Sequence, residues 1–431
     1  MLSPRIARIG AEAAWVVAGQ ALAFLGALVS IKVLTATLGP AAYGELAIGM
    51  TIAGVLHMFV YGPIEQVVLR YTSVYRERED LGIFFATLRL LHVRVGAAVI
   101  IALACAVAVI HVLAGSPWSA LAFAGVIFGL VSGINATLSS LHNAFRHRRV
   151  AALHQAGDVW LRLLLAVAAI YFVGPGAPET LLGFLAATAF IALSQFTALR
   201  TTSVVKGAMA TVDPLAQRKV LSEFLAYGIP YLWFALFAWL STYADRWIIL
   251  QYLDSHAVGM YVAVYQIANA PVILFVGMIN QFLVPVIFER AGTATTAAQM
   301  RASTRLLYHA LVPYIGAVLI FVAAAFYFAE PLIVALTSAE FAPAAHLLWL
   351  ICAGVGLASI GQLLVIKGLC YNRPQDYFWP KMLQTISLLA AALALVVPLG
   401  LTGIALALCV SGAVYIAATT AVNRRLSLSI S

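Results

Sequence analysis

The chain has 431 residues, of which 63% are hydrophobic and only 10% are charged, and its mean hydropathy is +0.99. A soluble globular protein has roughly 25% charged residues, so this composition excludes that class and indicates an integral membrane protein. The net charge of +9 comes from Lys and Arg residues that flank apolar segments, so it does not indicate a nucleic-acid-binding protein.

Twelve windows of about 20 mostly apolar residues are each long enough to cross roughly 30 Å of hydrocarbon as a helix. In chain order, the first six predicted spans are 13–36, 42–62, 85–112, 118–141, 156–174 and 180–199. The second six are 224–250, 257–282, 306–329, 344–368, 382–398 and 401–421. Because helices satisfy their own backbone groups in lipid, the predicted fold class is an all-α integral membrane protein with twelve transmembrane helices.

The positions of Lys and Arg predict how these helices are oriented, because cationic residues next to spans stay on the cytoplasmic side. If the N-terminus is cytoplasmic, the cytoplasmic segments hold the Lys and Arg of residues 5–8, 70–78, 146–149, 200–219, 290–305, 367–381 and 424–425. The six outside segments then contain neither residue type. Both termini are therefore predicted to be cytoplasmic.

The sequence also contains a weak internal repeat. A shift by half the length of the chain aligns Leu38–Gly44 with Leu253–Gly259 and matches Leu, Ala and Gly. Each half holds six predicted spans, an even number, so the halves share one orientation and are related by an axis along the membrane normal. We predict two pseudo-symmetric six-helix bundles around a central cavity, residues 1–205 and 223–431, joined by a cytoplasmic linker, 206–222.

Several motifs resemble those of a known family. Leu38–Gly44 is similar to the L-G-x-x-x-Y-G turn of polysaccharide-export flippases of the O-antigen type. The segments Tyr227–Pro230, Tyr243–Leu250 and Val258–Tyr261 resemble the seventh and eighth spans of these proteins. The family belongs to a superfamily that also contains multidrug and toxic compound extruders and the peptidoglycan-precursor flippase, and the resemblance extends over essentially the whole chain.

This resemblance implies a flippase of the inner (plasma) membrane that moves a polyprenyl-pyrophosphate-linked oligosaccharide from the cytoplasmic to the periplasmic leaflet by alternating access. Such a protein is not an enzyme and needs no cofactor, metal site or catalytic residue. Its expected partners are the lipid-linked oligosaccharide and membrane lipid, without nucleic acid, and it is expected to be a monomer. A coupling ion, H⁺ or Na⁺, is a further candidate, with Asp245 or Asp158 as the group that would carry it.

Charged residues inside spans are functional candidates, because insertion of one at a helix centre costs about 2.5–3.5 kcal/mol. Asp245 and Arg246 are neighbours in the seventh span and point in different directions, so at least one of them needs another partner. The repeat aligns Arg246 with the residue just before Lys32 in the first span. The two cations therefore have nearly equal depth in the two halves, and we predict that they line the cavity and bind the pyrophosphate. The alternative for Lys32 is that its side chain extends to the outer membrane surface.

Three more charged residues belong to the predicted substrate-binding set. Asp158 and Arg162 are spaced i,i+4 in the fifth span, so they can form either an ion pair or part of the cavity wall. Arg94 lies near the cytoplasmic end of the third span, where it can instead anchor the helix at the membrane surface.

The eighth span carries a polar stripe. Tyr261, Tyr265 and Asn269 follow one another at four-residue spacing, which places them on one helical face. We predict that they bind sugars, and the alternative is hydrogen bonding between packed helices. Pro63 and Pro271 are candidates for bends in the second and eighth spans.

Two other functions remain as alternatives. A cation-coupled multidrug extruder of the same fold would favour an acidic or aromatic cavity, whereas the charges inside these spans have a small cationic excess. A polysaccharide polymerase or ligase would be expected to bring a large outside loop or an acidic catalytic motif, and the outside segments here are short.

Overall fold

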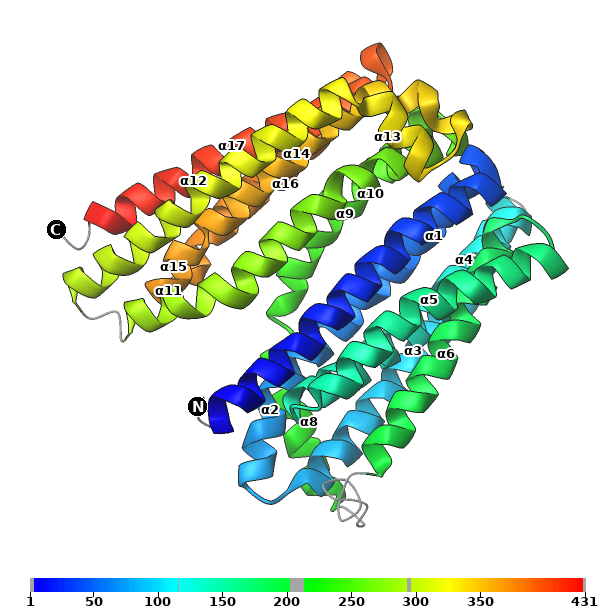
Figure 1. Ribbon diagram of the computed structural model, residues 1–431. Coiled ribbons are helices and arrows are strands. Elements are labelled where there is room, and N and C mark those ends of the chain that lie inside the picture. Colours follow the sequence, from blue (N-terminus) through cyan, green and yellow to red (C-terminus); the bar gives the residue numbers. More distant parts are fainter. Residues whose placement is uncertain (1–3, 115, 202–212, 293–295, 429–431) are drawn as a thin grey trace. The chain divides into compact units, whose positions relative to one another are not determined.

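The computed structural model describes residues 4–114, 116–201, 213–292 and 296–428, and in this part of the chain all regular elements are helices (Figure 1). The chain divides into two compact units. We call Met1–Leu38 with Glu45–Trp239 the N-terminal unit, and Gly39–Gly44 with Leu240–Ser431 the C-terminal unit.

In the N-terminal unit, α5 packs on α6, α6 packs on α4, and α4 packs on α2 and α3, while α8 packs on α2 and α3. The helices of this unit are α1 (Pro4–Leu56), η1 (His57–Tyr61), α2 (Gly62–Glu77), α3 (Leu81–Ala114), α4 (Ser116–Ala144), α5 (Arg148–Phe172), α6 (Ala177–Arg200) and α8 (Pro214–Gly228). Helix α9 (Tyr231–Tyr252) continues from this unit into the next. Of the predicted linker 206–222, residues 206–212 lie outside the described residues, and 214–222 form the first part of α8.

In the C-terminal unit, α17 packs on α14 and α16, and α14 also packs on α10 and α12. The helices of this unit are α10 (Ser255–Met278), η2 (Ile279–Leu283), α11 (Val284–Ala291), α12 (Ala297–Tyr327), α13 (Ala329–Leu336), η3 (Ala339–Leu347), α14 (Leu348–Leu364), α15 (Ile366–Cys370), η4 (Pro374–Tyr377), α16 (Phe378–Leu399) and α17 (Leu401–Leu428).

Among the described residues, ten helices are long and apolar enough to cross a membrane, or eleven if the bent pair α8 and α9 forms one span. One of the ten, Val17–Glu77, covers two of the predicted spans. Its helical course is broken at Gly39, which has φ 68° and ψ 173°, and Pro40 follows. Glycine adopts this backbone conformation without the steric cost that a Cβ would add. The predicted turn at Leu38–Gly44 is thus a sharp break between two helical segments.

Two π-helical turns each lie just before a proline. The turns His57–Tyr61 and Ile279–Leu283 each end two residues before a proline, Pro63 or Pro285. A proline ring clashes with the carbonyl four residues earlier, and a wider turn relieves that clash. In both turns the next residue donates its backbone N–H to the carbonyl five residues earlier. Pro271, the predicted bend of the eighth span, lies inside α10 with no break there.

The two glycines that the repeat aligns contact each other in the C-terminal unit. A Cβ built on Gly44 would lie 2.8 Å from the backbone nitrogen of Gly259, and one on Gly259 would lie 3.0 Å from that of Gly44. A Cβ on Gly259 would also overlap the carbonyl oxygen of Pro40. Only glycine allows the two backbones to approach so closely.

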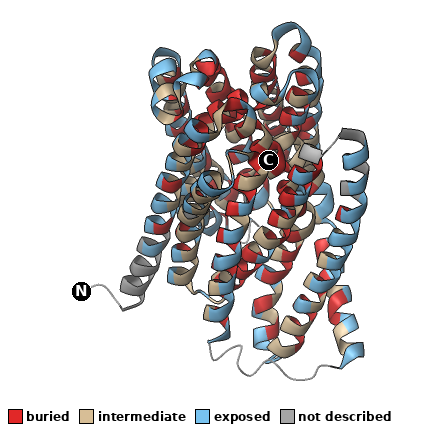
Figure 2. Cartoon of the chain, turned by 90° about the vertical axis from the view of Figure 1, so that its right-hand side faces the viewer, coloured by how far each residue is buried: buried red, intermediate tan, exposed pale blue. Residues whose placement is uncertain are grey.

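The helices have buried residues where they pack on neighbouring helices and large exposed apolar residues on their outward sides. Figure 2 shows buried and exposed residues along single helices. Tyr61, Phe84 and Phe224 belong to the core of the N-terminal unit and are at most 1% exposed. Outward-facing residues such as Leu319, Ile320 and Val397 are 64–72% exposed. Large exposed apolar surface is unusual in soluble proteins and suits contact with lipid. The predicted all-helical membrane fold is therefore confirmed.

Candidate substrate-binding site

Asp245 and Arg246 lie on α9 in the C-terminal unit, and both are buried, with 4% and 8% of their surfaces exposed. They make no ion pair with each other, because neighbours on a helix point about 100° apart. Asp245 instead accepts a hydrogen bond of 2.5 Å from the Tyr261 hydroxyl and one of 2.8 Å from the backbone N–H of Arg246. The expectation that at least one of the two charged residues needs another partner is confirmed by Tyr261.

The guanidinium of Arg246 lies against two aromatic rings. Its Cζ is 4.9 Å from the ring centroid of Tyr243 and 5.9 Å from that of Tyr265, which are cation–π distances. Its Nε is buried and has no hydrogen-bond partner among the described residues. A buried donor without an acceptor costs about 1–3 kcal/mol. Arg246 is therefore a cation held by aromatic faces, with one buried donor that no described residue satisfies.

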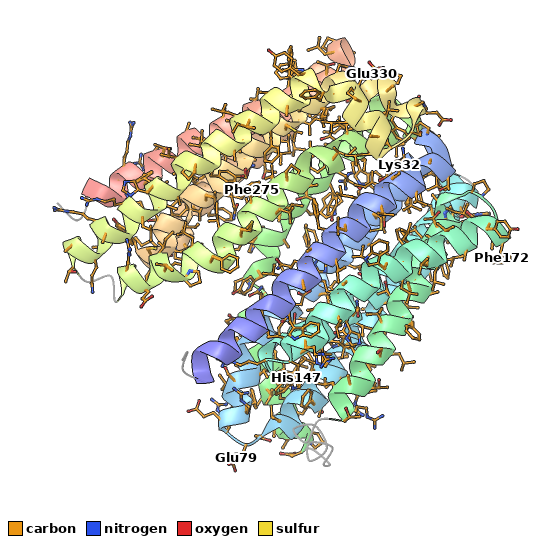
Figure 3. All side chains as sticks on the ribbon, viewed as in Figure 1. Lys32, Glu79, His147, Phe172, Phe275 and Glu330 are labelled. Atoms are coloured by element: carbon orange, nitrogen blue, oxygen red, sulfur yellow. The ribbon has the colours of Figure 1, made fainter. Side chains whose placement is uncertain are left out.

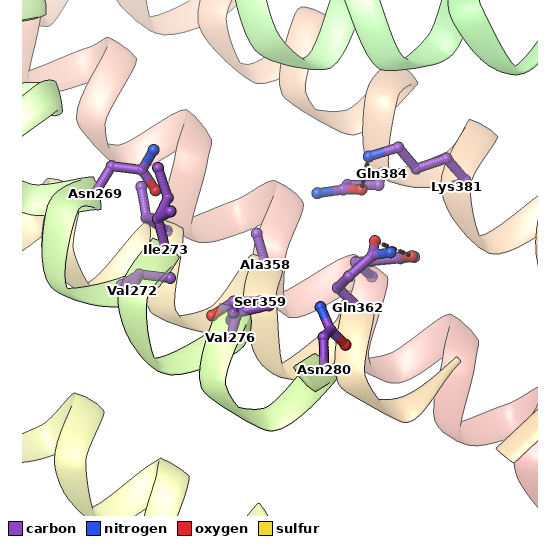
Figure 4. Close-up of a pocket in the computed structure, with 13 residues that line it drawn as sticks. Asn269, Val272, Ile273, Val276, Asn280, Ala358, Ser359, Gln362, Lys381 and Gln384 are labelled. Carbon is purple, nitrogen blue, oxygen red and sulfur yellow. Dashed lines mark hydrogen bonds between the residues drawn. The ribbon is translucent and has the colours of Figure 1, made fainter. Parts of the chain in front are cut away.

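The polar stripe on α10 divides into residues with different surroundings. Tyr261 is fully buried, so its hydroxyl serves Asp245 and is not open to a ligand in this structure. Tyr265 is half-buried, and its ring centroid lies 5.9 Å from that of Tyr261, at a tilted angle, and 5.9 Å from the Arg246 Cζ. Asn269, also half-buried, lines a pocket of the C-terminal unit (Figure 4). The four-residue spacing thus places Tyr265 and Asn269 where a ligand could reach them, and Tyr261 one turn deeper in the packing.

Asp158 and Arg162 form a closed cluster in the N-terminal unit. The Arg162 Nη2 lies 2.6 Å from Asp158 Oδ2, and the guanidinium also lies 5.1 Å from the ring centroid of Phe128. The buried Thr188 hydroxyl links the two, since it donates to Asp158 Oδ1 at 3.1 Å and accepts from Arg162 Nε at 2.8 Å. With these partners the pair joins α5 to α6, which favours the structural alternative.

This cluster yields a stability prediction. Asp158→Asn should lower the free energy of unfolding by about 3 kcal/mol, because it leaves Arg162 as an uncompensated, mostly buried charge. The double change Asp158→Leu with Arg162→Met removes both charges and should restore most of that loss. The measurement is the unfolding temperature of purified protein in detergent. An Asp158→Asn protein as stable as the parent would show that the pair does not hold α5 and α6 together.

The other two predicted cations lie at exposed positions. Lys32 is exposed on α1, seven residues before Gly39 (Figure 3), and Arg94 is exposed on α3. The described residues contain no group of three or more His, Cys, Asp or Glu side chains that could hold a metal ion.

The structure identifies a further candidate site residue, a lysine whose place in the sequence predicts only a role in membrane topology. Lys381 is one of the predicted cytoplasmic cations of residues 367–381, but it lines the same pocket as Asn269 together with Gln362, Gln384 and Tyr415. No periodic signal points to these residues, since they come from α14, α16 and α17. Their amide and hydroxyl groups within apolar spans are the only available sign.

The all-helical architecture with its apolar spans is similar to the fold of several solved membrane transporters. The structure of a lipid II flippase, MurJ, in an inward closed conformation matches with a TM-score of 0.70 and 14% identity, over 94% of this chain and 86% of that one. An inward-facing multidrug resistance MATE transporter of the MOP superfamily matches with a TM-score of 0.64 and 15% identity, over 94% of both chains. A MOP superfamily transporter from Pyrococcus furiosus matches with a TM-score of 0.55 and 14% identity, over 98% of this chain and 95% of that one.

The family follows from the sequence. A family model described as "Polysaccharide biosynthesis protein" matches residues 9–291, well over half of the chain, and the protein belongs to this family. No curated protein matches the chain significantly. The fold is similar to that of solved membrane transporters.

Proposed function

We propose that the protein is a flippase that moves a polyprenyl-pyrophosphate-linked oligosaccharide from the cytoplasmic to the periplasmic leaflet of the inner membrane by alternating access. Membership of the polysaccharide biosynthesis family supports a glycan-related cargo. The observation that carries the proposal is Arg246, a buried guanidinium inside a span that, among the described residues, has no carboxylate ion-pair partner and keeps one donor unsatisfied. Such a group suits an anionic cargo.

The physics of the cargo explains why a protein is needed. Each sugar hydroxyl that enters hydrocarbon without a hydrogen-bond partner costs a few kcal/mol, so several sugars do not cross unaided. Pyrophosphate adds negative charges that must be paired when they leave water. The protein must therefore provide a polar cavity that opens to one side at a time, while the prenyl tail stays in lipid.

Roles for the candidate residues follow from their surroundings. Arg246, and Lys32 at the repeat-related position, would bind the pyrophosphate in the central cavity, because an arginine fork and a lysine point charge both suit phosphate oxygens. Tyr265 and Asn269 would contact sugars, while Tyr261 would position Asp245. Arg162 and Asp158 would hold α5 against α6, and Arg94 would meet the phosphate-rich membrane surface.

The membrane arrangement is part of the same proposal. If Val17–Glu77 crosses twice, with its break at Gly39 between the crossings, and the bent pair α8 and α9 crosses once, the described helices supply twelve crossings. An even number places both termini on one side, the cytoplasm. We retain two pseudo-symmetric bundles, 1–205 and 223–431, a protein that acts as a monomer, and H⁺ or Na⁺ as the coupling ion at Asp245 or Asp158.

Reporter fusions test this topology. An alkaline-phosphatase reporter should be active, and a cytoplasmic fluorescent reporter dark, at every predicted outside position, because the outside segments lack Lys and Arg. The opposite result is expected at the cytoplasmic positions. The outside fusion sites are Gly115, Pro175, Asp254, Pro343 and Gly400, and the cytoplasmic ones are Arg148, Pro214 and Arg373. A cytoplasmic readout at two of the outside sites would contradict twelve crossings.

The function itself is tested in proteoliposomes. A fluorescent polyprenyl-pyrophosphate oligosaccharide should move between leaflets in vesicles that contain the protein, as measured by quenching with a membrane-impermeant reductant. Protein-free vesicles and vesicles with an unrelated membrane protein serve as controls. Transport of an organic cation such as ethidium, with no movement of the lipid-linked glycan, would identify a multidrug extruder instead.

A further inference from the structure

The C-terminal unit contains a pocket of about 450 Å³ between α10, α14, α16 and α17. This volume lies in the lower part of the range of small-molecule sites, roughly 300–1,000 Å³. Figure 4 shows its polar side chains around one space, with Lys381 and Gln384 on α16, Asn280 on η2 and the others on α10 and α14. These side chains are Asn269, Asn280, Ser359, Gln362, Lys381 and Gln384.

Lys381 gives the pocket a positive charge that no carboxylate among the described residues neutralises. Its Nζ donates a hydrogen bond of 2.9 Å to Gln384 Oε1 and lies 5.6 Å from the ring centroid of Tyr415. Both partners are uncharged, and none of the lining residues is an Asp or Glu. An ammonium has three donors, so two remain for a ligand. A lysine in an apolar bundle without a carboxylate favours a negatively charged ligand.

The rest of the lining suits a sugar. Gln362 accepts a hydrogen bond of 3.3 Å from the Tyr415 hydroxyl, which leaves its amide N–H donors for a ligand. The carboxamides of Asn269 and Asn280 make no hydrogen bond within the described part of the chain. Aliphatic residues such as Val276 and Val355 complete the wall. Carboxamides pair with hydroxyl groups as both donors and acceptors, and an aliphatic wall can cover the C–H face of a sugar ring.

We propose that this pocket binds a carboxylate-bearing sugar, a hexuronate, with Lys381 on the carboxylate and the carboxamides on the hydroxyls. The inference rests on the proposed glycan cargo and specifies its chemistry: the oligosaccharide contains an acidic sugar. One ammonium among neutral amides matches one carboxylate. A pyrophosphate would need more than one cation or an arginine fork, which this pocket does not offer.

The test is calorimetric titration of the full-length protein in detergent with methyl glucuronide, methyl glucoside and inorganic pyrophosphate. Methyl glucuronide should bind at least about tenfold more tightly than methyl glucoside, as expected of a hydrogen bond to a charged group. Lys381→Met should abolish this difference and leave glucoside binding unchanged. Lys219→Met, the same change at an exposed position of α8, should keep the difference.

A second variant tests the inference independently, in case Lys381→Met does not fold. Gln384→Glu is nearly isosteric and puts a carboxylate where Lys381 already donates, so it should abolish the preference for the acid while preserving the fold. Equal binding of glucuronide and glucoside to the parent protein would overturn the inference, and so would binding of pyrophosphate alone. Because soluble sugars are used, these outcomes are independent of whether the protein flips a lipid-linked glycan in vesicles.

Discussion

Replacement of Arg246 by Ala should slow the flipping of a lipid-linked oligosaccharide by roughly 10- to 100-fold, because hydrogen bonds to a charged group contribute about 1.5–3 kcal/mol. The variant should still fold and insert. In the described part of the chain Arg246 has no ion-pair partner that would be left behind, and Asp245 keeps its bonds to the Tyr261 hydroxyl and to a backbone N–H. The measurement is the initial flipping rate in proteoliposomes with matched amounts of protein.

Conservative changes separate charge from geometry. Arg246→Lys should retain part of the activity, because lysine supplies the charge without the two parallel donors of arginine. Lys32→Ala should be impaired and Lys32→Arg should keep most of the rate. Arg89→Ala removes an exposed arginine of α3 and serves as the control. Normal rates in both alanine variants would disprove the pyrophosphate assignment.

The contact between Gly44 and Gly259 leads to the second large expected effect. Gly259→Ala should destabilise the folded protein by about 1–3 kcal/mol, as overpacking does, because its Cβ would meet backbone atoms that cannot move aside. Glycine to alanine in an open helical position has the opposite sign and stabilises by up to about 1 kcal/mol. The sign of the change in the free energy of unfolding therefore shows whether the two glycines are in contact.

Gly316 on α12 is the matched control, because a Cβ there would meet nothing within 4 Å. Gly316→Ala should raise the unfolding temperature slightly, whereas Gly44→Ala and Gly259→Ala should lower it. Detergent-solubilised protein followed by a thermal unfolding assay gives both values. If Gly259→Ala behaves like Gly316→Ala, the close approach of Gly44 and Gly259 does not exist in the protein.

Hydrophobic length predicted the helices well, because the bilayer itself sets that length. The predicted span 118–141 lies within α4 and 382–398 lies within α16. The break at Gly39 was also predictable, since glycine followed by proline is a local signal. The helix lengths depend on the thickness of the bilayer, and the break at Gly39 depends on adjacent residues in the chain.

Features that depend on contacts between distant segments were not predictable in the same way. The partner of Asp245 is Tyr261, which lies on another helix, and only packing brings them together. Lys381 satisfies the positive-inside pattern, which marks it as an anchor, although it lines a pocket. The half-chain shift does not align Pro63 with Pro285, so the repeat gave no sign that a π turn precedes each of them.

Each of the two π turns changes the number of residues in its helix without changing the direction in which the later side chains point. In an uninterrupted α-helix, each added residue rotates everything beyond it by about 100°. A π turn absorbs one such residue, so the residues that follow keep their direction. Deletion of one residue from His57–Tyr61 should therefore let an ordinary helix re-form and leave Glu65 facing Ser140, whose hydroxyl donates to its Oε2 at 3.4 Å. Each turn therefore adds a residue to its helix without changing the direction in which the rest of that helix faces.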